Sequence, residues 1–315
     1  MGVICYVVAC LSLKNGAPVK PVLAALLCAA LSLGAFAADK PAKARAHKAT
    51  ADFTKDGEPN LQSTGALVLD PISGQTLYAK NAEQVVPIAS LTKIMTAMVV
   101  LDARLALDEA IQITSEDLDT IKNTRSRLPL GSHFRRDDLI RLALMASDNR
   151  AAAALGRNYP GGLPAFVEAM NAKAKVLGLA QTHYVDSSGL AAGNISSPQD
   201  LGKLVAAAAN YPLIREYSTT VAVNVTLPNS KRTIGFVNTN ALVRSSDWNI
   251  GLSKTGYISE SGKCLVMQAI IANQPIVIVL LDSWGRLTRI GDANRIRKWL
   301  ERNPAKFFAG PLRAG

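Results

Sequence analysis

The chain has 315 residues, of which 49% are hydrophobic, and it carries a formal charge of +11 from 35 basic and 24 acidic residues. A chain of this length and hydrophobic content can bury a sizeable core, which excludes wholesale disorder. The positive charge suits anionic polymers as partners and decides nothing about the fold.

The N-terminal segment has the pattern of an export signal. Lys20 precedes an apolar run over residues 21–37, which ends in the small-x-small sequence AFA of a signal-peptidase site. We therefore expect residues 1–37 to be a cleaved signal peptide and the chain to reach the periplasm. The run is short for a membrane span and no stop-transfer flank follows it, so we expect no stable membrane anchor. Residues 38–62, rich in Ala, Lys and Pro, are predicted to be a flexible basic linker.

Only one cysteine, Cys264, lies outside the predicted signal peptide. A single cysteine forms no internal disulfide, so the exported chain depends on its hydrophobic core for stability. The surrounding run CLVMQAI is apolar, and we expect Cys264 to be buried and unreactive.

Residues 63–303 are predicted to form the functional domain, followed by a C-terminal tail over residues 304–315. The first elements are a hairpin over 65–81 and a helix beginning near Ser90, whose apolar face consists of Leu91, Ile94, Met95, Met98 and Val99. Further helices are predicted over 135–147, 150–156, 163–178 and 197–210, strands over 249–259, 263–271 and 275–283, and a closing amphipathic helix over 291–303.

Strands at both ends of the domain thus enclose a helical middle. We expect the two strand groups to join into one mainly antiparallel sheet covered by helices, with a helical subregion beside it. That is an α+β fold rather than a series of alternating β and α units.

Ser90 and Lys93 lie three residues apart at the start of the first predicted helix. Residues three apart share one face of a helix, and backbone N–H groups at its N-terminus favour developing negative charge. A serine hydroxyl becomes a nucleophile beside a base, and lysine is a base when burial or a second cation lowers its pKa. The spacing alone nevertheless favours an ordinary core helix, because a chain of this composition contains about one S-x-x-K by chance.

Two later motifs change this interpretation. The sequence S-D-N over residues 147–149 interrupts a helical region, and K-T-G over residues 254–256 lies in a predicted strand. The set S-x-x-K, S-D-N and K-T-G in this order is typical of class A β-lactamases and penicillin-binding proteins. The sequence therefore predicts a serine acyl-transfer site.

The catalytic roles follow from the residue types. We expect Ser90 to attack the acyl carbon and Lys93 to take its proton. Lys254 supplies a second positive charge that helps to keep Lys93 neutral and holds a substrate carboxylate. Ser147 is expected to bridge the two lysines and to pass a proton to the leaving amine.

The remaining predicted site residues bind the substrate. Asn149 suits the substrate amide on the carbonyl side, the Thr255 hydroxyl suits the carboxylate beside the scissile bond, and Gly256 lets the substrate backbone lie close to the strand. The backbone N–H groups of Ser90 and Tyr257 are predicted to form the oxyanion hole.

Other chemistries find no support in the sequence. It contains neither a G-x-S-x-G elbow nor a phosphate-binding G-x-x-x-x-G-K-[ST] loop, and its three histidines show no metal-binding spacing. Basic residues are scattered without stacking aromatics. We therefore expect no metal, no cofactor and no nucleic-acid partner.

The chain resembles the low-molecular-mass serine D,D-peptidases, a family of penicillin-binding proteins, and among them most the D-alanyl-D-alanine endopeptidases. The segments that carry this resemblance span residues 87–103, 142–179, 238–244 and 251–269. The resemblance implies a β-lactamase/transpeptidase-like fold, peptidoglycan stem peptides and cross-links as substrates, and β-lactam antibiotics as covalent inhibitors. It implies hydrolysis of D-alanyl–diaminopimelate cross-links through a Ser90 acyl-enzyme, in remodelling of the cell wall.

Three alternatives remain open at this point. A D-alanyl-D-alanine carboxypeptidase would use the same motifs, since both substrates present a carboxylate beside the scissile amide. A penicillin-acylated sensor or peptidoglycan-binding module would share them too. A class A β-lactamase is disfavoured, because neither Glu168 nor Glu216 stands in the E-x-x-L-N motif that such enzymes carry after S-D-N.

Overall fold

The computed structural model describes residues 51–227, 232–302 and 304–308. The predicted signal peptide, residues 1–37, and the first part of the predicted linker, residues 38–50, lie outside the described residues. The strands are β1 (Ser63–Leu69), β2 (Thr76–Lys80), β3 (Val86–Pro87), β4 (Ala110–Gln112), β5 (His133–Arg135), β6 (Ile195–Ser196), β7 (Ala222–Thr226), β8 (Thr233–Val237), β9 (Asn249–Ile258), β10 (Gly262–Ile271) and β11 (Gln274–Ser283). The α-helices are α1 (Thr92–Asp102), α2 (Arg136–Met145), α3 (Asn149–Arg157), α4 (Gly162–Val176), α5 (Pro198–Ala208), α6 (Pro212–Thr219), α7 (Thr288–Arg302) and α8 (Pro304–Phe308).

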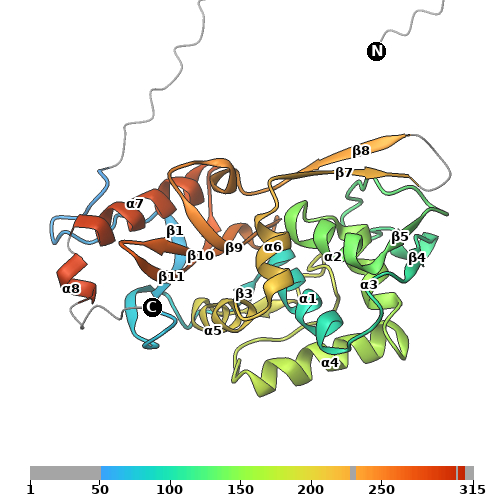
Figure 1. Ribbon diagram of the computed structural model, residues 1–315. Coiled ribbons are helices and arrows are strands. Elements are labelled where there is room, and N and C mark those ends of the chain that lie inside the picture. The colour runs from blue at the N-terminus through green and yellow to red at the C-terminus, as the bar shows by residue number, and fades with distance from the viewer. Residues whose placement is uncertain (1–50, 228–231, 303, 309–315) are drawn as a thin grey trace, which may run out of the picture. The chain divides into compact units, whose positions relative to one another are not determined.

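A five-stranded sheet in the order β2-β1-β11-β10-β9 joins the two ends of the domain. Every neighbouring pair in it is antiparallel. In Figure 1, α7 lies on one side of this sheet and α1 with its neighbouring helices on the other. The prediction of one antiparallel sheet built from both strand groups is confirmed, and the fold is α+β.

Alternate residues of the central strands enter two separate hydrophobic cores. In β11, Ile276 and Ile278 belong to the cluster that includes Trp299 of α7. Val277 and Val279 belong to the cluster formed with α1 and the other helices. Side chains alternate between the two faces of a strand, and both faces of β10 and β11 are buried. The sequences of both strands are therefore apolar almost throughout.

Cys264 on β10 is fully buried, as its apolar surroundings predicted. Burial raises the pKa of its thiol to about 11, which keeps the sulfur protonated and unreactive at neutral pH.

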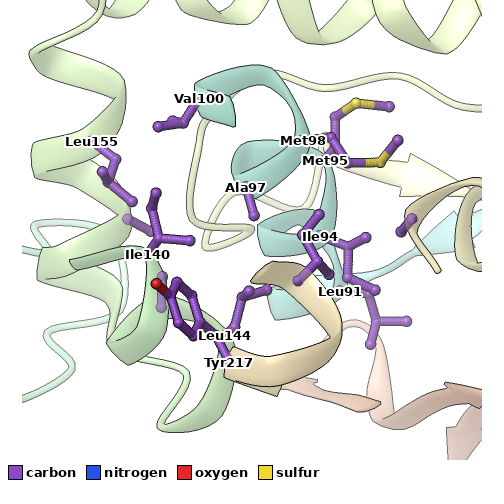
Figure 2. Packing of buried hydrophobic residues seen from close by; sticks show 14 of the residues in the cluster. Leu91, Ile94, Met95, Ala97, Met98, Val100, Ile140, Leu144, Leu155 and Tyr217 are labelled. Atoms are coloured by element: carbon purple, nitrogen blue, oxygen red, sulfur yellow. The ribbon is translucent and has the colours of Figure 1, made fainter. Parts of the chain in front are cut away.

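Helix α1 is the centre of the helical core. The predicted face of Leu91, Ile94, Met95, Met98 and Val99 is buried, and so is every residue from 92 to 100. Helices α2 to α6 all contact α1, and side chains such as Ile140 and Leu155 crowd around it in Figure 2. Because α1 is covered on all sides, Lys93 is buried although it is a charged residue type.

Several elements have no counterpart in the sequence-based prediction, among them α6 and the hairpin of β7 and β8. Helix α6 follows α5 after a short break, with Pro212 in its first turn. Strands β7 and β8 form a separate hairpin in which each strand buries one residue, Val225 or Phe236. A pair with so little buried surface leaves only a weak alternating pattern to detect.

The segments on either side of residues 63–303 contact α7. Asp52 forms an ion pair with Lys298 at 2.8 Å. Phe307 of α8 packs on Trp299 with 4.4 Å between ring centroids. Within the described residues, no helix has the length and apolar content needed to cross a membrane.

Candidate active site

Ser90 lies in a single 3-10 turn, Ala89–Leu91, that leads into α1. The turn is tight: Ala89 has a φ of +49°, which is unusual for a residue with a Cβ, and the Thr92 hydroxyl donates to the Ala89 carbonyl at 2.8 Å. Such unusual backbone geometry often marks a functional position. It places Ser90 ahead of the N-terminus of α1, where the helix dipole favours developing negative charge.

Lys93 lies one turn further on and is completely buried. Its Nζ contacts three oxygen atoms: Ser90 Oγ at 2.9 Å, Asn149 Oδ1 at 2.6 Å and the backbone oxygen of Ser188 at 2.6 Å. The two carbonyl oxygens can only accept, so they take both N–H groups of a neutral amine. The nitrogen lone pair is then left facing the Ser90 hydroxyl, which is the geometry that a general base requires.

Burial lowers the pKa of Lys93 to about 7. The carboxylates of Asp186, Asp148 and Asp119 act against this shift, because negative charges nearby favour the ammonium form. A substantial fraction of Lys93 is therefore neutral at physiological pH, as the proposed base must be.

Lys254 on β9 forms the other side of the site. It is 1% exposed, and its Nζ donates to Ser147 Oγ at 2.9 Å and to the Thr255 carbonyl at 2.8 Å. Burial, followed by the positive charges of Lys93 and Arg289, lowers its pKa well below the usual lysine value. The positive charge of Lys93 thus acts on Lys254, whereas burial is what lowers the pKa of Lys93, and the expected effect of Lys254 on Lys93 stays a prediction.

The expected role of Ser147 as a bridge between the lysines is only half realised. Its hydroxyl contacts Lys254, whereas Lys93 Nζ contacts Asn149. The reason is local: Ser147 has a φ of +58°, and Asp148 then caps α3 by accepting a hydrogen bond from the Ala151 N–H at 2.9 Å. Asn149 thereby becomes the first residue of α3 and faces Lys93.

Asn149 was expected to bind the substrate amide. In the structure its oxygen accepts from Lys93 and its Nδ2 donates to Thr124 Oγ1 at 2.8 Å. The side chain amide is therefore oriented by both contacts, with its NH₂ group directed toward the loop that carries Thr124. Sequence patterns gave no sign of Thr124, which lies 25 residues earlier in an irregular segment.

Gly256 brings β9 against the turn that carries Ser90. A Cβ at this position would lie 3.0 Å from the Ile88 carbonyl oxygen and 3.3 Å from the Ser90 nitrogen. The absence of a side chain thus permits the strand itself to approach the nucleophile, in addition to the expected approach of substrate. Tyr257, the next residue, is 61% exposed beside this contact.

Thr255 is 5% exposed, and its hydroxyl donates to Thr239 Oγ1 at 2.7 Å. Thr239 in turn is held by a hydrogen bond from its N–H to the Met145 carbonyl. Thr239 belongs to the segment NTNALVR and lies outside the three motifs, so the sequence did not identify it as a site residue.

The loop YVDSSGL over residues 184–190 also contacts the site, and the sequence did not predict this contact. The Asp186 carboxylate accepts hydrogen bonds from the N–H groups of Ser188, Gly189 and Ala191 at 2.5–2.9 Å. This network directs the Ser188 carbonyl at Lys93. Asp and Gly three residues apart indicate a turn, but not which lysine that turn will contact.

Arg289 at the start of α7 is another residue near the site that the sequence did not predict. Its Nη1 donates to the Gly256 carbonyl at 3.4 Å, and its positive charge contributes to the lowered pKa of Lys254. It lies 35 residues after Lys254 among scattered basic residues, and only the packing of α7 on the sheet brings it to the site.

Two further features bear on the choice of site. A cavity of about 710 Å³ is lined by α4 and residues 178–183. It includes none of the predicted site residues, so the chemistry of the side chains rather than cavity size identifies the site. Among the described residues, no group of three or more His, Cys, Asp or Glu side chains is arranged to hold a metal ion.

Comparisons with known proteins agree with this geometry. Residues 52–284 match the Peptidase S11 family, described as D-alanyl-D-alanine carboxypeptidase. The chain is 48% identical over 244 residues to a D-alanyl-D-alanine endopeptidase of Pseudomonas aeruginosa, covering 78% of this chain and 79% of that protein. It is 45% identical over 252 residues to the D-alanyl-D-alanine endopeptidase of Escherichia coli, covering 80% and 81%.

A solved structure shares the fold. The Streptomyces K15 DD-transpeptidase superimposes with a TM-score of 0.72 at 30% identity, over 76% of this chain and 97% of that one. The family match extends over most of the chain and includes every residue assigned above to the site except Arg289. The chain is thus a serine peptidase that belongs to the Peptidase S11 family.

Proposed function

We propose that the protein is a penicillin-sensitive D,D-endopeptidase that hydrolyses D-alanyl–diaminopimelate cross-links in peptidoglycan through an acyl-enzyme on Ser90. The observation that carries this proposal is the contact of Ser90 Oγ with Lys93 Nζ, whose two other contacts are carbonyl oxygens. A neutral amine in this setting can accept only the serine proton.

The proposed reaction begins with proton transfer from Ser90 to Lys93 as Oγ attacks the carbonyl carbon of the scissile amide. The resulting oxyanion is stabilised by the backbone N–H groups of Ser90 and Tyr257, at the turn where β9 approaches the nucleophile. Ser147, held by Lys254, donates a proton to the leaving amine and is reprotonated with the proton that Lys93 took from Ser90, so Lys93 is neutral again. Water then attacks the ester carbonyl while Lys93 takes one of its protons, and that proton returns to Ser90 Oγ as the acyl product leaves.

The side chains around Ser90 also bind the substrate in this proposal. Lys254 and Thr255 supply a positive charge and a hydroxyl for the carboxylate beside the scissile bond, and Arg289 adds a second cation behind Gly256. The NH₂ group of Asn149, directed by Thr124, supplies a donor to the acyl side. This assigns the leaving group to the Thr255 end of the site and the acyl group to the Asn149 end.

The choice of endopeptidase over carboxypeptidase rests on the relatives, since those at 45–48% identity are named endopeptidases. A D-alanyl-D-alanine carboxypeptidase of Bacillus subtilis is 27% identical. The β-lactamase alternative has less support, because Glu168 is exposed on α4 and Glu216 pairs with Arg141 on α2. Neither glutamate makes a hydrogen bond or ion pair to the residues around Ser90, so slow deacylation and inhibition by penicillins are expected.

The cellular setting is part of the proposal. Removal of residues 1–37 as a signal peptide would place the domain of residues 63–303 in the periplasm, joined to a basic linker. Peptidoglycan stem peptides and cross-links are then the partners, and the positive charge of the chain suits this anionic polymer.

The test is incubation of the purified protein with cross-linked muropeptide dimers and with monomeric pentapeptides. We expect dimers to be converted into monomers because the carboxylate-binding residues accept the D-centre of a cross-linking residue. If the protein only trims pentapeptides to tetrapeptides, the carboxypeptidase assignment replaces this one. If it releases products from neither, the protein acts as a sensor or binding module.

A further inference from the structure

Residues 119–124, which we call the 119–124 loop, form a rigid turn above the site. The Asp119 carboxylate accepts hydrogen bonds from the N–H groups of Ile121, Lys122 and Thr124 at 2.8–2.9 Å and from the Thr124 hydroxyl at 2.6 Å. These bonds hold the pKa of Asp119 below its usual value despite partial burial. The backbone of the loop is therefore held in place although it contains no helix or strand.

The 119–124 loop contacts both sides of the active site, the α3 side and the β9 side. On the α3 side, Thr124 accepts the hydrogen bond from Asn149. On the β9 side, Lys122 forms an ion pair with Glu260, which lies in the turn between β9 and β10. The second carboxylate oxygen of Glu260 accepts from Ser259 Oγ at 2.8 Å, so the charge is held in place from its own side too.

The position of this ion pair relative to the substrate follows from the order of groups along β9. Thr255 is assigned to the leaving-group carboxylate, and Tyr257 to the oxyanion. Continuing in the same direction leads from the scissile bond toward the acyl group and then to the turn at Glu260. Asn149, on the α3 side of the site, is also at the acyl end. The Lys122–Glu260 pair thus lies across the acyl end of the site.

We propose that Lys122 and Glu260 form a latch that determines how large an acyl-side chain the enzyme accepts. This inference rests on the proposed function, because it uses the direction in which the substrate is assigned to lie. With the latch closed, a short acyl group fits beneath the 119–124 loop. A long stem peptide reaches Ser90 only after the ion pair opens.

The exposure of the two side chains suits a latch that opens readily. Lys122 is 27% and Glu260 is 40% exposed, and ion pairs at such positions are weak because water and salt compete for both charges. Residues 126–128 hold the base of the loop more firmly. Ser126 donates to Asp148, and Arg150 donates to the Leu128 carbonyl. Opening can therefore be confined to the tip.

The test compares acylation of the full chain by two β-lactams that differ on the acyl side. One is 6-aminopenicillanic acid, which has no acyl side chain, and the other is a penicillin whose side chain carries a bulky fluorophore. The variants are Glu260→Gln, Lys122→Met and the charge exchange Lys122→Glu with Glu260→Lys. Glu301→Gln is the matched control, because Glu301 is 42% exposed and pairs with Arg297 within α7, outside both the 119–124 loop and the turn between β9 and β10.

We expect each single variant to raise the ratio of the two acylation rate constants, bulky over small, by about two- to fivefold. The charge exchange should return the ratio to within about twofold of the unaltered protein, and the control should leave it unchanged. An unchanged or lowered ratio in the single variants, or a charge exchange that behaves like them, would overturn the latch. Failure of both β-lactams to acylate the unaltered protein would instead count against the proposed function.

Discussion

Ser90→Ala is expected to abolish covalent labelling by a fluorescent penicillin and to lower peptidase activity by about 10⁶-fold. Alanine has no nucleophilic atom, so no acyl-enzyme can form whatever the state of Lys93. The fold should persist, because the Ser90 side chain makes a single hydrogen bond, to Lys93, at the edge of the core. Labelling is measured by gel fluorescence, and activity by release of monomers from muropeptide dimers.

The control for this experiment is Ser73→Ala, which removes a hydroxyl from the exposed turn between β1 and β2. That variant should be labelled at the rate of the unaltered protein. Persistent labelling of Ser90→Ala would show that a different residue is the nucleophile, and the roles assigned to Lys93 and Ser147 would then have no basis.

Gly189→Ala is expected to lower the free energy of unfolding by about 3 kcal/mol or more and to slow acylation of Ser90 strongly. Gly189 has a φ of +80°, and a Cβ there would lie 1.9 Å from the Ala89 carbonyl oxygen and 2.8 Å from Thr92 Oγ1. Relief of this overlap must move either the turn that carries Ser90 or the loop that directs the Ser188 carbonyl at Lys93. A fall in Tm of about 10 °C would accompany it.

Gly178→Ala is the control that separates the cost of the backbone conformation from the cost of steric overlap by the added Cβ. Gly178 also has a positive φ, +67°, but nothing lies within 4 Å of the added Cβ. This variant should cost about 1 kcal/mol for its backbone conformation and leave acylation unchanged. If the two variants lose similar stability and both acylate normally, then the close packing of the 184–190 loop on the Ser90 turn has no functional role.

Much of the fold could be predicted because its elements have clear periodic patterns. The two long strands β10 and β11 are apolar almost throughout, and α5 has an N-cap at Ser197 that the structure reproduces with a hydrogen bond from the Asp200 N–H. The pairing of β1 with β11 followed from the need to bury both strand groups in one sheet. By contrast, α6 and the β7–β8 hairpin bury too few residues to give a pattern.

The site was predictable to the extent that its residues lie in three short motifs. Spacing alone placed Ser90 beside Lys93, since both belong to one helical turn. The contacts between motifs were harder: Asn149 rather than Ser147 contacts Lys93, because a positive φ at Ser147 redirects the chain. Ser188, Thr124 and Arg289 depend on tertiary packing, and no local pattern identifies them.

The pH dependence of Ser90 acylation tests the central claim most directly, namely that a neutral, buried Lys93 activates the serine. Since the neutral form is active and burial lowers the pKa of Lys93 to about 7, the acylation rate should fall about tenfold per pH unit below about pH 6 and level off above about pH 8. Lys93→Met should lose both the rate and its pH dependence. A rate that is independent of pH, or that rises only near the usual lysine pKa above about 10, would contradict the assignment of Lys93 as the base.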